Sequence, residues 1–347
     1  MSPDDALESA LQLLDSPMAN AASTTNKLGY VFEEGKTALS YSRGNTLNTC
    51  PRKYQLREKL QQKNHSPSIH TAFGHMVGAG IAALFEYGGD LPRAMVAGFA
   101  LWDYPAASDL FGKEKTKSVA SAFAHIESFY IHHYPSFAEE YEIAILNGRP
   151  ASELFVYVSI TDKHNYQVHI DLILRSKFTG ALLVVEFKTS VRAATAAQWE
   201  NSRQTVGYFA ILETLARREN IPIEPGVIYF CIQSGKMWDE EANYGVQVLP
   251  FAKTPDTMVD FVQELMYDIN RIDYMEEQNF YPKNGASCVD FNRPCEFFQQ
   301  CDTLIHTVEH TKSSGAIYQS LTLEDCDYVL DLQEIVDNIQ DNHLTQS

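Results

Sequence analysis

The chain has 347 residues, of which 45% are hydrophobic and 21% are charged, so it can build the substantial core of an ordinary globular protein. No apolar run approaches the roughly 20 residues that span a bilayer, and the acidic N-terminus lacks the basic and apolar regions of a signal peptide. We therefore expect a cytoplasmic protein with no membrane segment. The formal net charge of −18 argues against a protein that coats nucleic acid with its whole surface.

The charge is unevenly distributed along the chain. Residues 41–70 contain six Lys or Arg and one acidic residue, whereas residues 302–347 contain nine acidic residues and one Lys. A basic stretch in an acidic chain is consistent with a local surface that contacts phosphates. A solvated helix face explains the same charges equally well.

The first half of the chain predicts helices followed by strands. Residues 1–40 are polar and acidic and predict a loose lead-in with one short helix. Helices are expected at 46–60, with Pro51 in the first turn, at 71–86 and at about 115–135. Three β-branched, apolar runs then predict strands, with a hairpin turn at SKFTG before the last: ELFVYVSI, YQVHIDLILR and ALLVVEFKTS.

The second half predicts further helices around one more strand. A helix is expected from AAQWENSRQTVGYFAILETLARR, a strand from GVIYFCIQ and a helix at about 256–275. A Cys-rich loop and an acidic tail with a terminal helix at 323–340 follow. This order of helices and strands predicts a mixed α/β core.

Two carboxylates and a lysine lie in the second and third predicted strands. Asp171 interrupts the apolar run VHIDLIL, and Glu186 and Lys188 lie in VVEFKTS. Because side chains alternate along a strand, Glu186 and Lys188 share one face, and a hairpin would place Asp171 beside Glu186. Such carboxylates can hold Mg²⁺ or Mn²⁺ for phosphodiester hydrolysis, while Lys188 orients the water and neutralises charge. An isolated Glu-x-Lys is more often a surface ion pair, so the interpretation depends on its neighbours.

Gln204 and Tyr208 lie four residues apart in the helix that follows, and so share one of its faces. Gln204 can contact the lysine or a phosphate, and Tyr208 can contact a nucleic-acid backbone. In isolation, the pair would instead suggest a loop cap and core packing.

These segments, taken in order, resemble motifs II, III and IV of the PD-(D/E)XK nuclease superfamily in its RecB-like branch. The resemblance covers most of residues 41–301. It implies a restriction-endonuclease-like α/β core, in which a mixed central sheet is flanked by helices. It also implies metal-binding and catalytic roles for five residues: Asp171, Glu186, Lys188, Gln204 and Tyr208.

The family also tends to carry a histidine in an upstream helix, at the position that is Gly78 in GHMVGAG. His75 lies one turn earlier and can replace it as a metal ligand. A buried or capping role for His75 is the alternative. Glu153, in the first of the three strands, is either a further neighbour of the metal site or a surface acid.

Three of the six cysteines are clustered, with six and then five residues between Cys288, Cys295 and Cys301. An iron–sulfur cluster or a zinc site needs a fourth ligand, and Cys50 is the best candidate. This one-plus-three arrangement, with CPRKY and PCEFFQQC, resembles AddB-type helicase–nuclease subunits and CRISPR-associated iron–sulfur exonucleases. It implies a 4Fe-4S cluster that ties the first helix to the C-terminal loop. Zinc with the same ligands and four unrelated cysteines are the alternatives.

The resemblance implies a Mg²⁺- or Mn²⁺-dependent DNA exonuclease that serves recombination, repair or phage DNA processing. Arg52, Lys53 and Arg57, beside Cys50, would contact the DNA. Because the chain has no P-loop, unwinding would come from a helicase or recombination partner protein. The alternatives are a non-catalytic DNA-end-binding or structural protein, against which the intact site residues argue, and a metal-dependent enzyme with another substrate.

The same reasoning divides the chain into three regions. We expect an acidic N-terminal lead-in at 1–40, a nuclease domain at 41–301 that the four-cysteine cluster closes, and an acidic C-terminal tail at 302–347.

Overall fold

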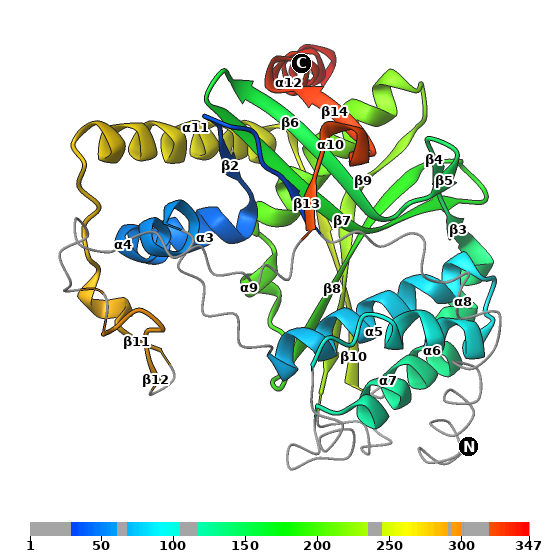
Figure 1. Cartoon of the computed structure of the whole chain (residues 1–347). Coiled ribbons are helices and arrows are strands. Elements are labelled where there is room, and N and C mark those ends of the chain that lie inside the picture. The colour runs from blue at the N-terminus through cyan, green and yellow to red at the C-terminus, as the bar shows by residue number, and fades with distance from the viewer. Residues whose placement is uncertain are drawn as a thin grey trace.

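An eight-stranded mixed sheet forms the centre of the computed structural model, with helices on both of its faces (Figure 1). The structure describes residues 29–60, 68–104, 117–234, 245–290, 293–299, 301 and 319–346. The strand order along the sheet is β10 (Val246–Ala252), β9 (Ile223–Gln233), β8 (Leu182–Ser190), β7 (His164–Ser176), β6 (Ser152–Thr161) and β14 (Tyr328–Asp331). Two short strands also pair with β7: β2 (Thr37–Leu39) and β3 (Tyr141–Ile143).

The sheet contains both parallel and antiparallel pairs. Strands β6, β7 and β8 form an antiparallel meander, whereas β8 pairs with β9, β14 with β6 and β2 with β7 in parallel. The expected core, a mixed central sheet flanked by helices, is therefore confirmed. Three small two-stranded sheets lie outside it: β1 (Gly29–Val31) with β13 (Gln319–Leu321), β4 (Ile145–Leu146) with β5 (Arg149–Pro150), and β11 (Val289–Asp290) with β12 (Arg293–Pro294).

Two large hydrophobic clusters, one on each face of the sheet, form most of the core. Val184 lies in one cluster and Val185 in the other, as the alternation of a strand requires. On the first face pack α10 (Arg203–Arg218), α11 (Pro255–Glu277) and α12 (Leu332–Gln346). On the second face pack α5 (Ile69–Glu86), α6 (Leu91–Phe99), α7 (Val119–His132) and, beside them, α8 (Tyr134–Glu140). None of the described helices is both long and apolar enough to cross a membrane.

Two expected helices are divided in the structure. The helix expected at 46–60 is α3 (Tyr41–Thr49), then α4 (Pro51–Tyr54), then a π-helical turn at Gln55–Lys59. Cys50 between α3 and α4 has φ −161° and ψ 110°, because a residue that precedes proline avoids the helical region. The helix expected from Ala196 is α9 (Ala196–Trp199) and then α10, since Ser202 is extended.

The strand and turn predictions at the centre of the sheet are confirmed. The three expected strands are β6, β7 and β8, and the expected turn joins the last two, with Gly180 at φ +73°. The helix expected at 256–275 is α11, and the terminal helix is α12, which begins nine residues later than expected and follows a 3-10 turn at Leu323–Asp325 and β14.

Candidate active site

Strand β7 has one edge that is open over its middle. β6 pairs with residues 164–172 along one edge of β7. β2 and β8 also pair with residues in this range, so both lie along the other edge of β7. β2 pairs with residues 164–166 and β8 with residues 172–175. Among the described strands, none pairs with residues 167–171 on that side. A cavity of about 220 Å³ lies there, and Asp171 lines it at the end of the gap.

The hairpin places Asp171 beside Glu186. Leu172 pairs with Val185, so the next position of the antiparallel register sets Asp171 level with Glu186. The Phe187 N–H donates to Asp171 Oδ2 at 2.8 Å and fixes the carboxyl group of Asp171. Glu186 is buried, and its Oε2 has no hydrogen-bond partner among the described residues.

A chain of polar contacts connects the third strand to helix α10. Lys188 forms an ion pair with Glu186, and its Nζ donates to Gln204 Oε1 at 2.8 Å. The Gln204 Nε2 in turn donates to the Tyr208 hydroxyl at 2.8 Å. The i, i+4 spacing on α10 therefore lets Tyr208 contact Gln204, which contacts the lysine, and both Gln204 and Tyr208 line the cavity with Asp171.

Glu153 also lies in the cavity, directly across from Asp171. Ser152 pairs with Leu172 and Leu154 with Ile170, so Glu153 is opposite Asp171 in the register. Its φ of +50° is in the left-handed region, which residues other than glycine seldom adopt. The structure thus gathers three carboxyl groups, from β6, β7 and β8.

These carboxyl groups disfavour one another's charged forms. Burial, followed by the repulsion of Glu186 and Glu153, raises the pKa of Asp171 well above its ordinary value. Burial and Glu186 raise the pKa of Glu153 to about 7. Burial alone would lower the pKa of Lys188, but the carboxylates of Glu186 and Asp171 raise it above its ordinary value. The site therefore holds a charged lysine beside an excess of acidic groups.

The arrangement suits a divalent cation. No three His, Cys, Asp or Glu side chains within the described part of the chain are gathered as a finished metal site. However, the free Oε2 of Glu186 and the repulsion among Asp171, Glu153 and Glu186 are both relieved by a cation with oxygen ligands. Carboxylate oxygens are donors that match Mg²⁺ or Mn²⁺.

The histidine of α5 that reaches the cavity is His75. Its side chain lines the cavity with Asp171, and burial lowers its pKa. Gly78, where the family pattern placed a histidine, points elsewhere: a Cβ there would contact the Phe187 ring at 3.5 Å. Phe187 lies on the opposite face of β8 from Glu186, so a histidine at residue 78 would face away from the carboxylates.

The sequence did not predict several of the residues that line the cavity, among them Tyr41 and His169. Tyr41 comes from the first turn of α3, and no local pattern connects it to β7. His169 is two residues before Asp171 and so shares its face of the strand, which is a signal that the sequence does contain. His169 stacks on Phe155 with ring centroids 4.4 Å apart.

The cysteine segments lie near one another. The Asn284 N–H donates to Cys50 Sγ at 3.5 Å, and the Cys288 thiol donates to the Asn284 carbonyl at 3.7 Å. Cys295 flanks the small β11–β12 hairpin opposite Cys288, and its N–H donates to the Cys288 carbonyl at 2.8 Å. Four thiols suit an iron–sulfur cluster or zinc, although these four, all in the described residues, are not gathered into a metal site.

The basic residues beside Cys50 contact the Cys-rich loop. Lys53 and Arg57 form ion pairs with Glu296 at 3.6 and 3.1 Å, and Arg52 donates from Nη1 to Gln55 at 3.0 Å. Their predicted contact with DNA stays a prediction.

Comparison with known proteins shows the family of the chain. The sequence profile of the PD-(D/E)XK nuclease superfamily matches residues 38–302, which include every residue discussed above. No curated protein matches the chain. A crystal structure of a candidate exonuclease from Eubacterium rectale is similar, with 9% identity and a TM-score of 0.43 over 77% of this chain and 94% of that one. On the profile match, which covers most of its length, this chain belongs to the PD-(D/E)XK nuclease superfamily.

Proposed function

We propose that the protein is a Mg²⁺- or Mn²⁺-dependent DNA exonuclease of the RecB-like branch. The observation that supports the proposal is the contact chain from Glu186 through Lys188 and Gln204 to Tyr208. Gln204 and Tyr208, at one end of this chain, line a cavity together with Asp171. A surface ion pair would not bury Glu186 or join the lysine to a helix of the core.

In the proposed reaction, Asp171 and Glu186, with His75 at the same cavity, are the residues that would hold the cation. A bound divalent cation lowers the pKa of water and stabilises charge on a phosphodiester. Lys188 is positioned by Glu186 and Gln204 to orient the attacking water and to neutralise the charge that develops on the phosphate. Tyr208 positions the lysine through Gln204.

We infer further that Cys50, Cys288, Cys295 and Cys301 hold a 4Fe-4S cluster, with zinc as the alternative. The contacts of both Cys50 and Cys288 with Asn284 support a common site. Action in recombination, repair or phage DNA processing, together with a helicase partner, stays a prediction from the family resemblance.

Asp171→Asn should lower the cleavage rate at least about 100-fold while leaving the fold intact, because it removes a metal-binding charge but keeps the side-chain volume. The measurement compares degradation of linear single-stranded, linear duplex and circular DNA in Mg²⁺ or Mn²⁺. Asp162→Asn, the same change at an exposed turn between β6 and β7, is the matched control and should cleave as the unmodified protein does.

Three outcomes of this assay would change the proposed function. Full activity of Asp171→Asn would make the catalytic assignment wrong. Degradation of circles as fast as linear DNA would indicate an endonuclease. If the unmodified protein binds DNA ends but degrades none of the three substrates, the non-catalytic alternative holds.

A further inference from the structure

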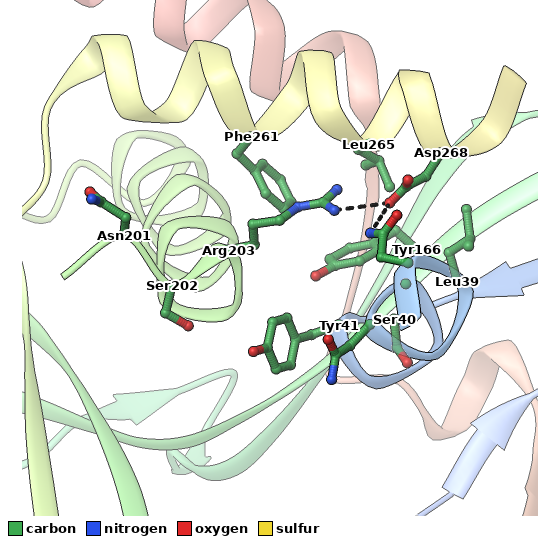
Figure 2. Close-up of a pocket in the computed structure, with 13 residues that line it drawn as sticks. Leu39, Ser40, Tyr41, Tyr166, Asn201, Ser202, Arg203, Phe261, Leu265 and Asp268 are labelled. Atoms are coloured by element: carbon green, nitrogen blue, oxygen red, sulfur yellow. Dashed lines mark hydrogen bonds and ion pairs between the residues drawn. The ribbon is translucent and has the colours of Figure 1, made fainter. Parts of the chain in front are cut away.

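A second cavity, of about 270 Å³, lies directly beside the candidate active site (Figure 2). It lies between the first turns of α3, the start of α10 and one face of α11. Ser40 and Tyr41 line both this cavity and the one that contains Asp171, so the two cavities meet at these residues. Among its described lining residues, none is a predicted catalytic residue or a cysteine.

The charges in the second cavity are already paired. Arg203 forms ion pairs with Glu264 at 2.6 Å and with Asp268 at 2.9 Å. Asp268 is buried and is also contacted by Arg271 and by the Asn48 amide, each at 3.4 Å. A phosphate would have to displace these carboxylates from Arg203, whereas a neutral ligand would leave the buried network intact. The cavity therefore suits an uncharged, polar ligand.

Three aromatic rings form part of the lining, and Figure 2 shows them extending into the space between the helices. Tyr166 and Phe261 are buried and meet edge to face, with ring centroids 5.7 Å apart. Gly207 of α10 permits this packing, because a Cβ there would lie 2.8 Å from the Phe261 ring. Tyr41 is half-buried where the two cavities meet. Three exposed amide side chains complete the lining: Asn45, Asn48 and Asn201.

We propose that the second cavity binds one unpaired base of the strand whose phosphodiester lies in the active site. The proposal rests on the nuclease function and adds to it the substrate class, a single-stranded end. A nucleobase matches this lining, since its faces stack on aromatic rings and its edges hydrogen-bond to amides. A base enters so small a cavity only when it is separated from its partner strand. Tyr41 is placed to stack between the base and the scissile phosphate.

Abasic substitution tests the proposal. Single-stranded oligonucleotides, labelled at either end, carry one abasic nucleotide at successive positions, and their binding is measured in EDTA. The unmodified protein should bind roughly ten- to hundred-fold more weakly when the abasic nucleotide falls at one particular distance from the end. Tyr41→Ala should bind the intact strand more weakly than the unmodified protein does, by the same factor. It should bind that abasic strand as tightly as the unmodified protein does. Tyr41→Phe, which keeps the ring, should bind as the unmodified protein does.

The control is Tyr274→Ala, which removes a 64% exposed aromatic side chain of α11 that does not line the cavity. It should leave binding of the intact strand unchanged. Equal binding of all strands by the unmodified protein, no binding at all, or additive losses in Tyr41→Ala would each overturn the base-binding cavity. Cleavage of the same strands after Mg²⁺ or Mn²⁺ is added tests the nuclease function separately, so a failure there leaves the binding result standing.

Discussion

Glu153 combines a strained backbone with a half-buried carboxyl group. A φ of +50° costs a residue other than glycine roughly 1–3 kcal/mol, and such strain is concentrated at functional sites. The same residue lies opposite Asp171, and the repulsion of Glu186 adds to burial in raising its pKa to about 7. Glu153 therefore belongs to the candidate active site, with Asp171 and Glu186, and is not a surface acid of the sheet.

His125 of α7 is a second residue with an unfavourable environment, and it does not line the candidate active-site cavity. It is fully buried, and neither ring nitrogen has a hydrogen-bond partner among the described residues. Its one contact of note is edge to face with the Phe73 ring. Burial lowers the pKa of His125 from 6.5 to about 4, so the folded protein holds this imidazole neutral.

We predict that His125 makes the folded state less stable as the pH falls. In the unfolded chain the imidazole takes up a proton near pH 6.5, but in the folded chain it does so only near pH 4. The free energy of unfolding should therefore fall by about 3 kcal/mol between these values through this residue alone. His125→Leu should remove that part of the slope in urea denaturation curves measured from pH 7 to pH 4. His132→Gln, at an exposed position of the same helix, is the control. Slight burial lowers the pKa of His132 too, so this variant should change the slope in the same direction but much less. An unchanged slope in His125→Leu would contradict the prediction.

At the scale of elements, the sequence predicts what depends on local pattern and fails where distant segments decide. The three central strands are predictable because their apolar, β-branched runs end at turn residues, and strand alternation then places Glu186 and Lys188 on one face. Two helix breaks were not predicted, one at Ser202 and one between α3 and α4 at Cys50. Each depends on the conformation of one or two residues and not on the periodicity of the whole segment. The role of Tyr41 depends on β2 pairing beside the gap in β7, which no local pattern reveals.

The histidine of the site shows the same limit. The family pattern gave its position as Gly78, whereas the side chain that reaches the cavity is His75. The rotation of α5 on the sheet decides this, since Gly78 packs on Phe187. Residues three or four positions apart are neighbours on the surface of a helix. The sequence alone therefore does not decide which of two such positions reaches the site.

The proposed iron–sulfur cluster would join α3 and α4 to the β11–β12 hairpin. We predict that protein purified without oxygen contains iron and acid-labile sulfide, and that Cys50→Ser loses both, because four thiolates are needed to hold the cluster. Cys326→Ser is the control, since Cys326 lies near the Thr322 carbonyl and away from Asn284, and it should retain the iron. Bound zinc that Cys50→Ser loses would establish the zinc alternative. Metal-free protein would mean four unrelated cysteines.

At the scale of the whole molecule, the C-terminal segment completes the sheet. β14 pairs with β6 in parallel and covers what would otherwise be its edge, and α12 packs against α10 and α11. The expected acidic tail thus contains apolar residues of the main core, among them Leu330, Ile335 and Ile339. On the exposed side of α12, Glu334 pairs with Arg218, and Asp341 pairs with Arg217 at 3.0 Å.

This division between the two sides of α12 leads to a prediction about stability. Ile339 is 2% exposed in the main hydrophobic cluster, so Ile339→Ala should lower the free energy of unfolding by about 2–5 kcal/mol through lost burial and the cavity that remains. Asp341→Ala, two residues away, removes an exposed ion pair and should cost less than about 1 kcal/mol. Urea denaturation at neutral pH measures both variants. Equal decreases in the free energy of unfolding would show that α12 is held to the domain by its charges. A large decrease in Ile339→Ala alone would show that residues beyond the four cysteines fold with the nuclease core.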